Sequence, residues 1–305
     1  MNIYNATQNA QSIHIHGPYN LPALVGIFVA QCSDVDLIIH THGMISPLYR
    51  ENVGLFKRFY EKLLLSNKFR WRALTNLEAK EIVNVFGDVR VDVISNCVNI
   101  SEIDHLKTVY PIENIDFLTL SLMTGRKAIF FGRISSIKGV FELVTAWKKF
   151  ESESDDWFLI FIGPFDSSIL NIFLSAVRDN PSIKYFQPPE EKLKYAFLKM
   201  ADVFILPSKA EGQSLALLEA MALSLPVIYT SVCQFNFKLK AQIGLNSTER
   251  LDGDSLSEFI YKSLITFSKT PKRDVEKLGA AGRLVCEKHY DVTKVGKMFL
   301  QTYNC

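Results

Sequence analysis

The fold is decided by the stretch Pro207-Ser208-Lys209-Ala210-Glu211-Gly212-Gln213-Ser214-Leu215-Ala216-Leu217-Leu218-Glu219-Ala220-Met221-Ala222. The apolar run before it, residues 202–206, is typical of a buried strand that Pro207 ends. Ser214 is a favoured N-cap residue, so the sequence predicts a helix that starts there and ends at Leu225-Pro226. The free amides of this helix start therefore face outward from the carboxyl edge of a strand.

Two carboxylates flank that helix start. Glu211 lies in the loop before it, and Glu219 lies four residues after Leu215, on the same helical face. Ligands of open α/β sheets bind at this edge, and unpaired amides favour a phosphate. A nucleotide sugar, with phosphate in the middle and hydroxyls at both ends, suits this arrangement. The spacing alone is equally consistent with a capping loop that carries two solvated glutamates.

Apolar strands alternate with helices along the whole chain, which predicts parallel sheets covered on both faces. The first series has strands at residues 12–17, 36–43, 70–75 and 90–94, with helices at 21–32, 50–67 and 77–86. The pattern loosens between residues 101 and 125, where we place the domain junction. The second series has strands at 127–132, 157–163, 183–186, 202–206 and 226–230, with helices at 140–150, 169–178, 190–200 and three more from Ser255, Asp274 and Asp291.

Three motifs together resemble glycosyltransferase family 4, the retaining enzymes of the GT-B fold. Glu211 and Glu219 match its Glu-x7-Glu signature, and the flanking residues 201–208 and 225–228 match as well. Residues 132–139, Gly-Arg-Ile-Ser-Ser-Ile-Lys-Gly, look like the family's Gly-Arg-x4-Lys-Gly loop. His42-Gly43-Met44 resembles its His-Gly-Met motif. Residues 75–79 and 94–99 also resemble family segments, although Asn-Cys-Val-Asn stands where the family usually has Asn-Gly-Val-Asp.

The resemblance implies a GT-B protein with two doubly wound, Rossmann-like domains. Residues 1–120 are expected to form a shortened N-terminal, acceptor-side domain, because additional βα units normally precede this point in the family. Residues 121–289 are expected to form the nucleotide-sugar domain, and a helix near 290–305 to pack back on the first. The strand at 12–17 or a neighbour would then become a sheet edge.

Site roles also follow from the resemblance. Glu211 and His42 are the implied catalytic residues, with Glu211 at the sugar hydroxyls and His42 reaching the sugar from the opposite domain. The implied donor-binding residues are Gly132, Arg133, Lys138, Gln213, Ser214, Leu215 and Glu219, with Glu219 at the ribose. Arg133 and Lys138 suit a pyrophosphate, although two basic residues in a loop are also compatible with a solvated surface. His14, His16 and His40 match no family motif and are interpreted as structural.

The implied activity is transfer of a sugar from a nucleotide sugar, such as a UDP- or GDP-sugar, with retention at the anomeric carbon. The enzyme would be of hexosyltransferase type and would need no metal or cofactor. Its acceptor would be a glycan or a lipid-linked sugar in bacterial surface polysaccharide assembly, such as lipopolysaccharide O-antigen, capsule or exopolysaccharide. The alternative is a non-catalytic remnant or partner subunit that still binds a nucleotide sugar.

Composition narrows the classes further. At 305 residues and 48% apolar, the chain is long enough for two cores, and a formal charge of +2 predicts no nucleic-acid partner. Its five cysteines are scattered singly, which favours a reducing cytoplasm over a disulfide framework or zinc site. No apolar run reaches transmembrane length. The basic residues of the expected helix between Arg50 and Arg72 predict contact with an anionic membrane at its inner face or with a lipid-linked acceptor. A solvated helix face is the alternative.

Overall fold

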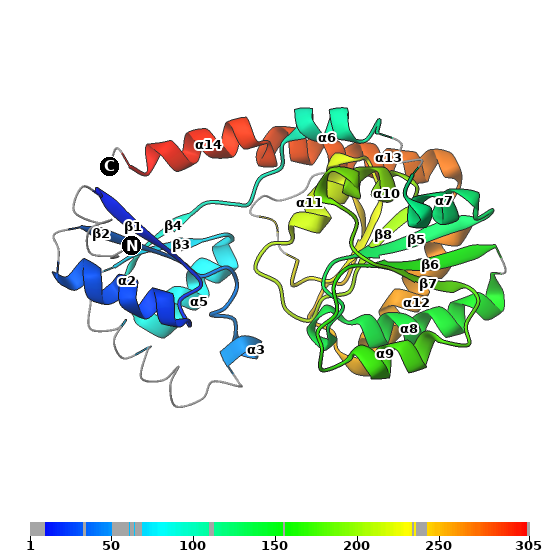
Figure 1. Cartoon of the computed structure of the whole chain (residues 1–305), viewed down its shortest axis with the longest axis horizontal. Helices are drawn as coiled ribbons and strands as arrows, with labels where there is room; N and C mark the ends of the chain where they lie inside the picture. Colours follow the sequence, from blue (N-terminus) through cyan, green and yellow to red (C-terminus); the bar gives the residue numbers. More distant parts are fainter. Residues whose placement is uncertain are drawn as a thin grey trace.

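The computed structural model describes residues 10–32, 35–50, 61, 64, 69–109, 113–154, 156–233, 235 and 243–303. They form two α/β units with parallel sheets, which lie side by side in Figure 1. Each sheet has its own hydrophobic core. The expected architecture of two parallel-sheet domains is confirmed.

The first sheet has the strand order β1-β2-β3-β4. Trp71 is fully buried at its centre and stacks on Phe86, with ring centroids 4.3 Å apart. The described strands run in chain order, so no reversal of winding occurs among them. The strands are β1 (Ser12–His16), β2 (Asp36–His40), β3 (Arg70–Ala73) and β4 (Arg90–Val93), and the helices are α2 (Leu21–Cys32), α3 (Pro47–Arg50) and α5 (Asn76–Phe86).

The second sheet has the order β10-β9-β8-β5-β6-β7, in which the winding reverses between β5 and β8. This is a doubly wound sheet, and ligands of such sheets bind outside the carboxyl ends of the strands at the reversal. All four side chains of β8 are buried, as expected for a strand covered on both faces. The strands are β5 (Arg126–Phe131), β6 (Trp157–Ile162), β7 (Ile183–Phe186), β8 (Val203–Leu206), β9 (Val227–Tyr229) and β10 (Gly244–Asn246).

Helices cover both faces of this second sheet (Figure 1). One layer contains α8 (Val140–Phe150), α9 (Leu170–Val177) and α12 (Gly253–Lys269). The other contains α7 (Ile115–Leu122), α10 (Lys194–Lys199), α11 (Leu215–Ala222) and α13 (Lys272–Val285). The carboxyl edge between β5 and β8 stays free of these layers and faces the first domain.

The segment between the sheets is more ordered than the sequence indicates. It forms α6 (Ile100–Leu106) and α7, which begin at N-caps whose side chains accept from backbone amides: Asn99 from Glu102 and Asn114 from Phe117. Helices of seven and eight residues are too short to show a clear apolar period. Their buried side chains, including Ile103 and Leu120, belong to the second core. The core boundary therefore lies before Val98 rather than at the expected residue 120.

The last helix, α14 (Val292–Gln301), leads back to the first sheet (Figure 1). It follows the π-helix η4 (Cys286–Tyr290), and the chain passes beside Val98, whose amide donates to Tyr290 O at 2.8 Å. At its far end, the centroid of the Phe299 ring lies 4.0 Å from the guanidinium carbon of Arg72 on β3. The C-terminal helix thus joins the two domains.

The expected basic surface between Arg50 and Arg72 is only partly described, since residues 51–60, 62–63 and 65–68 lie outside the described residues. Arg70 pairs with Asp92 at 3.1 Å, and Arg72 is 3% exposed, so strand β3 presents neither to a membrane. This part of the membrane-contact prediction is wrong because both residues are in a strand under α14. Within the described chain, no helix combines the length and apolar composition needed to cross a lipid bilayer.

Hydrogen exchange should distinguish the two sheets. Among the described strands β1 is an edge of a four-stranded sheet, as predicted, whereas β5, β6 and β8 are interior strands of a six-stranded one. Fewer buried residues surround the first sheet. We expect native-state exchange to be faster in residues 12–93 than in residues 126–229, measured by mass spectrometry. Equal protection of the two sheets would contradict this ranking.

Candidate active site

A cavity of about 750 Å³ opens where the winding of the second sheet reverses. It lies at the carboxyl ends of β5 and β8, and Met44 of the first domain closes one side. The sequence-predicted residues Gly132, Arg133, Lys138, Glu211 and Ser214 all line it. Residues from both halves of the doubly wound sheet therefore meet at one place.

The loop after β5 is fixed on the end of β8. It contains the 3-10 helix η1 (Ser136–Lys138) and ends at Gly139, whose φ is +68°. A Cβ at Gly139 would lie 2.1 Å from the carbonyl oxygen of Pro207, so only glycine permits this approach. The amide of Lys209 donates to Ile137 O at 2.8 Å and closes the contact. This packing brings Lys138 next to Glu211.

Lys138 and Glu211 form the central ion pair of the cavity. Lys138 Nζ lies 2.7 Å from Oε1 and 2.6 Å from Oε2 of Glu211, and their side chains are 22% and 10% exposed. Arg133 is exposed at the same cavity and makes no ion pair with another described residue. The site thus holds one cation in an ion pair and a second cation, Arg133. Hydrogen bonds from Ser168 lower the pKa of the nearby Asp166, and Arg133 helps to lower it without forming an ion pair with Asp166.

The start of α11 also faces this cavity. Ser214 is the N-cap, as predicted, and its Oγ accepts from Leu217 N at 3.3 Å. The other amides of the first turn, including those of Leu215 and Ala216, lie where an α-helix offers no backbone acceptors. They can therefore donate to an anion.

Glu219 does not line the cavity. Its buried carboxylate lies against α10, where Lys194 Nζ approaches to 2.7 Å and Tyr195 Oη donates at 3.3 Å. Burial and the Glu219 charge raise the pKa of Tyr195, so the phenol stays protonated. The predicted pair Glu211 and Glu219 is therefore divided between two ion pairs, each with its own lysine.

Gln213 connects the domains. Its Oε1 accepts from Asn96 N at 2.6 Å, and its carbonyl accepts from Asn96 Nδ2 at 2.8 Å. Its side-chain Nε2 is buried without a hydrogen-bond partner among the described residues. The sequence predicted that Gln213 contacts the donor. In the structure Gln213 instead contacts Asn96 of the other domain. The family resemblance at residues 94–99 had assigned no such contact to Asn96.

His42 and Gly43 approach the same loop from the first domain. Both lie in the turn after β2 with positive φ values, +49° and +79°. A Cβ at Gly43 would lie 2.7 Å from the Cα and N atoms of Gly212, so two glycine backbones touch across the interface. His42 Nε2 lies 2.8 Å from His16 Nδ1. Burial is the larger cause that lowers the pKa of His42, and the charge of His16 is the second. The structure thus places the backbone of His42 beside the Glu211–Gly212 loop, but its imidazole lines a second, interdomain cavity with His16 and His40 and does not line the cavity at Glu211.

Glu78 holds that turn in position. It is 2% exposed, and its carboxylate accepts from Thr41 Oγ1, Gly43 N and, at 2.6 Å, Leu74 N. Thr75 caps α5 by accepting from Glu78 N at 3.1 Å. A carboxylate with three donors fixes both strand ends next to the cavity. Sequence reasoning missed this role, although Thr-x-x-Glu at 75–78 is a capping-box pattern that marks the helix start.

Glu78→Gln should destabilise the first domain. An amide offers one acceptor oxygen and brings a donor toward the remaining N–H groups, whereas charged hydrogen bonds contribute about 1.5–3 kcal/mol each. We expect the free energy of unfolding to fall by about 2–3 kcal/mol, measured by urea denaturation. Glu81→Gln, one turn along the same helix, is the control and should change it by less than about 0.5 kcal/mol. If both substitutions changed the free energy of unfolding equally, Glu78 would not be the residue that fixes the turn after β2.

Comparisons with known proteins agree with this geometry. The family described as Glycosyl transferases group 1 matches residues 112–239. A curated relative, the putative teichuronic acid biosynthesis glycosyltransferase TuaC of Bacillus subtilis, is 35% identical over 107 residues, which cover 35% of this chain and 25% of the relative. The chain thus spans about a quarter of the length of that relative.

The fold of nearly the whole chain also occurs in solved structures. Anabaena HepE in complex with UDP and glucose superposes with a TM-score of 0.78 at 15% identity, covering 99% of this chain and 80% of HepE. An α,α-trehalose-phosphate synthase from Burkholderia xenovorans gives 0.80 at 13% identity, and a sucrose-phosphate synthase from Thermosynechococcus elongatus gives 0.75 at 18%; each match covers 99% of this chain and 75% of the other. The chain therefore has the GT-B fold, and its residues 112–239 match the Glycosyl transferases group 1 family.

Proposed function

We propose that this protein is a retaining glycosyltransferase of family 4 and hexosyltransferase type, which uses a nucleotide sugar such as a UDP- or GDP-sugar. The observation that carries the proposal is the cavity between β5 and β8, where Arg133, Lys138, Glu211 and the start of α11 meet. Structures of HepE with UDP and with UDP-glucose support a nucleotide-sugar donor, because HepE shares this fold.

The proposed acceptor is a glycan or lipid-linked sugar of a bacterial surface polysaccharide, at the cytoplasmic face of the membrane. The name of the similar Bacillus subtilis protein, which refers to teichuronic acid biosynthesis, supports this setting. The first domain would provide the acceptor side, since Met44 lines the cavity and Gly43 contacts Gly212 in the adjacent loop.

The chemistry requires stabilisation of a leaving diphosphate. A retaining transfer passes through an oxocarbenium-like state while negative charge develops on the leaving group. In the proposed complex Arg133, Lys138 and the first amides of α11 meet that charge from three directions. This chain's own cations and amides supply the stabilisation, and no metal is proposed for the reaction.

Glu211 then has two tasks. Its pairing with Lys138 keeps the ammonium group at the cavity, and in the proposed complex its oxygens would accept from hydroxyls of the sugar. An ionised carboxylate has about four acceptor sites, so it can serve the lysine and the sugar together. Glu219, which is paired with Lys194 and does not line the cavity, would have to become accessible for its proposed contact with the ribose. His42, uncharged at neutral pH because its pKa is lowered, would orient the sugar from the first domain.

A donor panel tests the proposal. UDP- and GDP-sugars are titrated by calorimetry, and hydrolysis and transfer are followed by chromatography with lipid-linked and free glycan acceptors. We expect one donor to bind and be turned over, with retained configuration in the product by NMR. Inverted product would contradict the retaining mechanism. Donor binding without hydrolysis or transfer would instead support a non-catalytic partner subunit.

A further inference from the structure

Four of the six histidines of the chain occur in two copies of one short pattern. His14-Ile15-His16-Gly17 ends β1, and His40-Thr41-His42-Gly43 ends β2. Side chains two residues apart in a strand lie on the same face. The parallel register pairs His16 with His40, so each pattern directs its imidazoles to the same face of the sheet edge. The repeat therefore brings the rings together.

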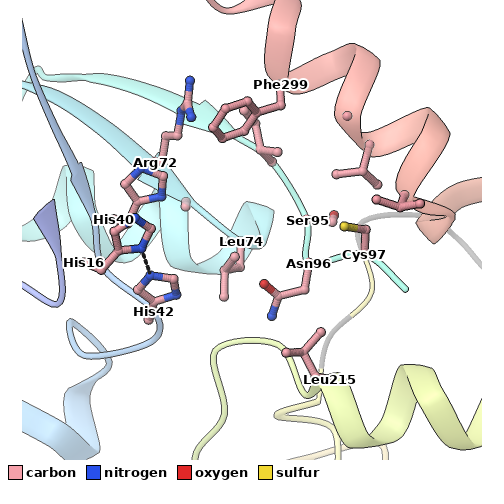
Figure 2. A pocket seen from close by; sticks show the side chains of 15 residues that line it. His16, His40, His42, Arg72, Leu74, Ser95, Asn96, Cys97, Leu215 and Phe299 are labelled. Carbon is pink, nitrogen blue, oxygen red and sulfur yellow. Dashed lines mark hydrogen bonds between the residues drawn. The ribbon is translucent and has the colours of Figure 1, made fainter. Parts of the chain in front are cut away.

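The rings form a contiguous stack beside a second cavity. His16 and His40 have centroids 4.3 Å apart, and His16 and His42 5.1 Å apart. One ring nitrogen from each of these three residues lies within 4.8 Å of the others. Figure 2 shows them side by side at the wall of an interdomain cavity of about 360 Å³. This space leaves room for a further ligand of a bound ion.

We propose that His16, His40 and His42 form a binding site for a divalent transition-metal ion of the Zn²⁺ class. Three imidazoles with an open position are an established set of ligands for zinc. Zinc–nitrogen bonds of about 2.0–2.1 Å place tetrahedral ligand nitrogens roughly 3.3 Å apart. The hydrogen-bonded pair His16 Nδ1 and His42 Nε2, now at 2.8 Å, must therefore open only slightly.

Outer contacts orient the ligands. His14 Nδ1 lies 2.9 Å from His40 Nε2, and its own Nε2 lies 2.7 Å from Tyr303 Oη. Metal-bound histidines commonly use their second nitrogen in this way. Arg72 is a nearby cation, and Figure 2 shows its guanidinium directed toward Phe299 and away from His42.

Calorimetry with Zn²⁺ on metal-stripped, untagged protein tests the site. We expect one ion per chain, at least 100-fold weaker binding in His16→Gln and His40→Gln, and 10- to 100-fold weaker binding in His14→Gln. His105→Gln, at an exposed histidine outside the cluster, is the matched control and should bind as the wild type does. Circular dichroism checks that each variant is folded.

A second measurement needs no variant. Diethyl pyrocarbonate modifies accessible histidines, and mass spectrometry locates the modified residues. Zn²⁺ should protect His16 and His42 and leave His105 unprotected. Absence of saturable Zn²⁺ binding, or protection of His105 equal to that of His16, would overturn the proposal. His42 is also the proposed contact to the donor sugar, so a bound ion and a donor would compete for its imidazole. All these measurements are therefore made without donor, and their failure would leave the proposed transferase function standing.

Discussion

Lys138→Met is expected to weaken UDP binding about 10- to 100-fold and also to lower the free energy of unfolding by about 1–3 kcal/mol. The binding loss follows because a charge-assisted contact to phosphate contributes about 1.5–3 kcal/mol. The stability loss follows because the Glu211 carboxylate, 10% exposed, would remain in the cavity without its lysine. Calorimetry with UDP and GDP and urea denaturation measure the two effects.

Arg133→Met separates these effects. Arg133 lines the same cavity without an ion pair to a described residue, so its loss should weaken nucleotide binding and leave stability unchanged. The double variant Lys138→Met/Glu211→Gln should regain stability but not binding, because it removes the orphaned charge. Lys149→Met is the surface control, since Lys149 and Glu258 pair at 2.8 Å with side chains 53% and 42% exposed. If Lys138→Met and Arg133→Met have equal effects on stability, the ion pair is not structural.

Much of the fold was predictable because apolar runs and their end signals are local. Residues 21–32, 140–150 and 183–186 form the predicted helices and strand with the predicted bounds. Ser214 acts as the N-cap that its residue type indicates. The donor-side loops also fall at the predicted sheet edge, since strand order in a doubly wound sheet brings those ends together.

Contacts between side chains that are far apart in the sequence could not be predicted from the spacing of residues within a motif. Glu219 has a suitable position on α11, yet its lysine comes from α10, 25 residues earlier in the sequence. Gln213 finds Asn96 in the other domain. Both contacts depend on how the helices and domains pack, which a motif does not contain. The strand β10 was not predicted, because its sequence Gly-Leu-Asn lacks the apolar run that marks the equally short β9, Val-Ile-Tyr.

The histidine cluster shows the same limit in another form. Each His-x-His-Gly pattern, considered alone, is compatible with a structural strand end. The two patterns form one cluster only because β1 pairs with β2 in the register that sets His16 opposite His40. Strand register is set by tertiary packing, so the sequence carried the ligand types without indicating that they meet.

Gly43→Ala should lower transfer activity by about 100-fold or more while changing UDP affinity less than about threefold. A Cβ at Gly43 would lie 2.7 Å from backbone atoms of Gly212, and backbone cannot swing aside as a long side chain can. The first domain must therefore move away from the Glu211 loop, which displaces His42 from its proposed place at the sugar. Lys138 and Arg133 remain in the second domain, so nucleotide binding persists. Steady-state kinetics and calorimetry measure the two quantities.

Gly87→Ala is the matched control for this prediction. Gly87 has the same φ of +79°, but a Cβ there meets no atom within 4 Å. Both substitutions place an alanine at a positive φ, at Gly87 with a ψ of −149°, which costs about 1–3 kcal/mol, and both should lower the unfolding midpoint. Only Gly43→Ala adds the interdomain collision, so the difference in transfer activity between the two variants isolates the contact between Gly43 and Gly212. Equal activities would mean that transfer does not require this approach of the domains, and the proposed role of His42 would then have to be abandoned.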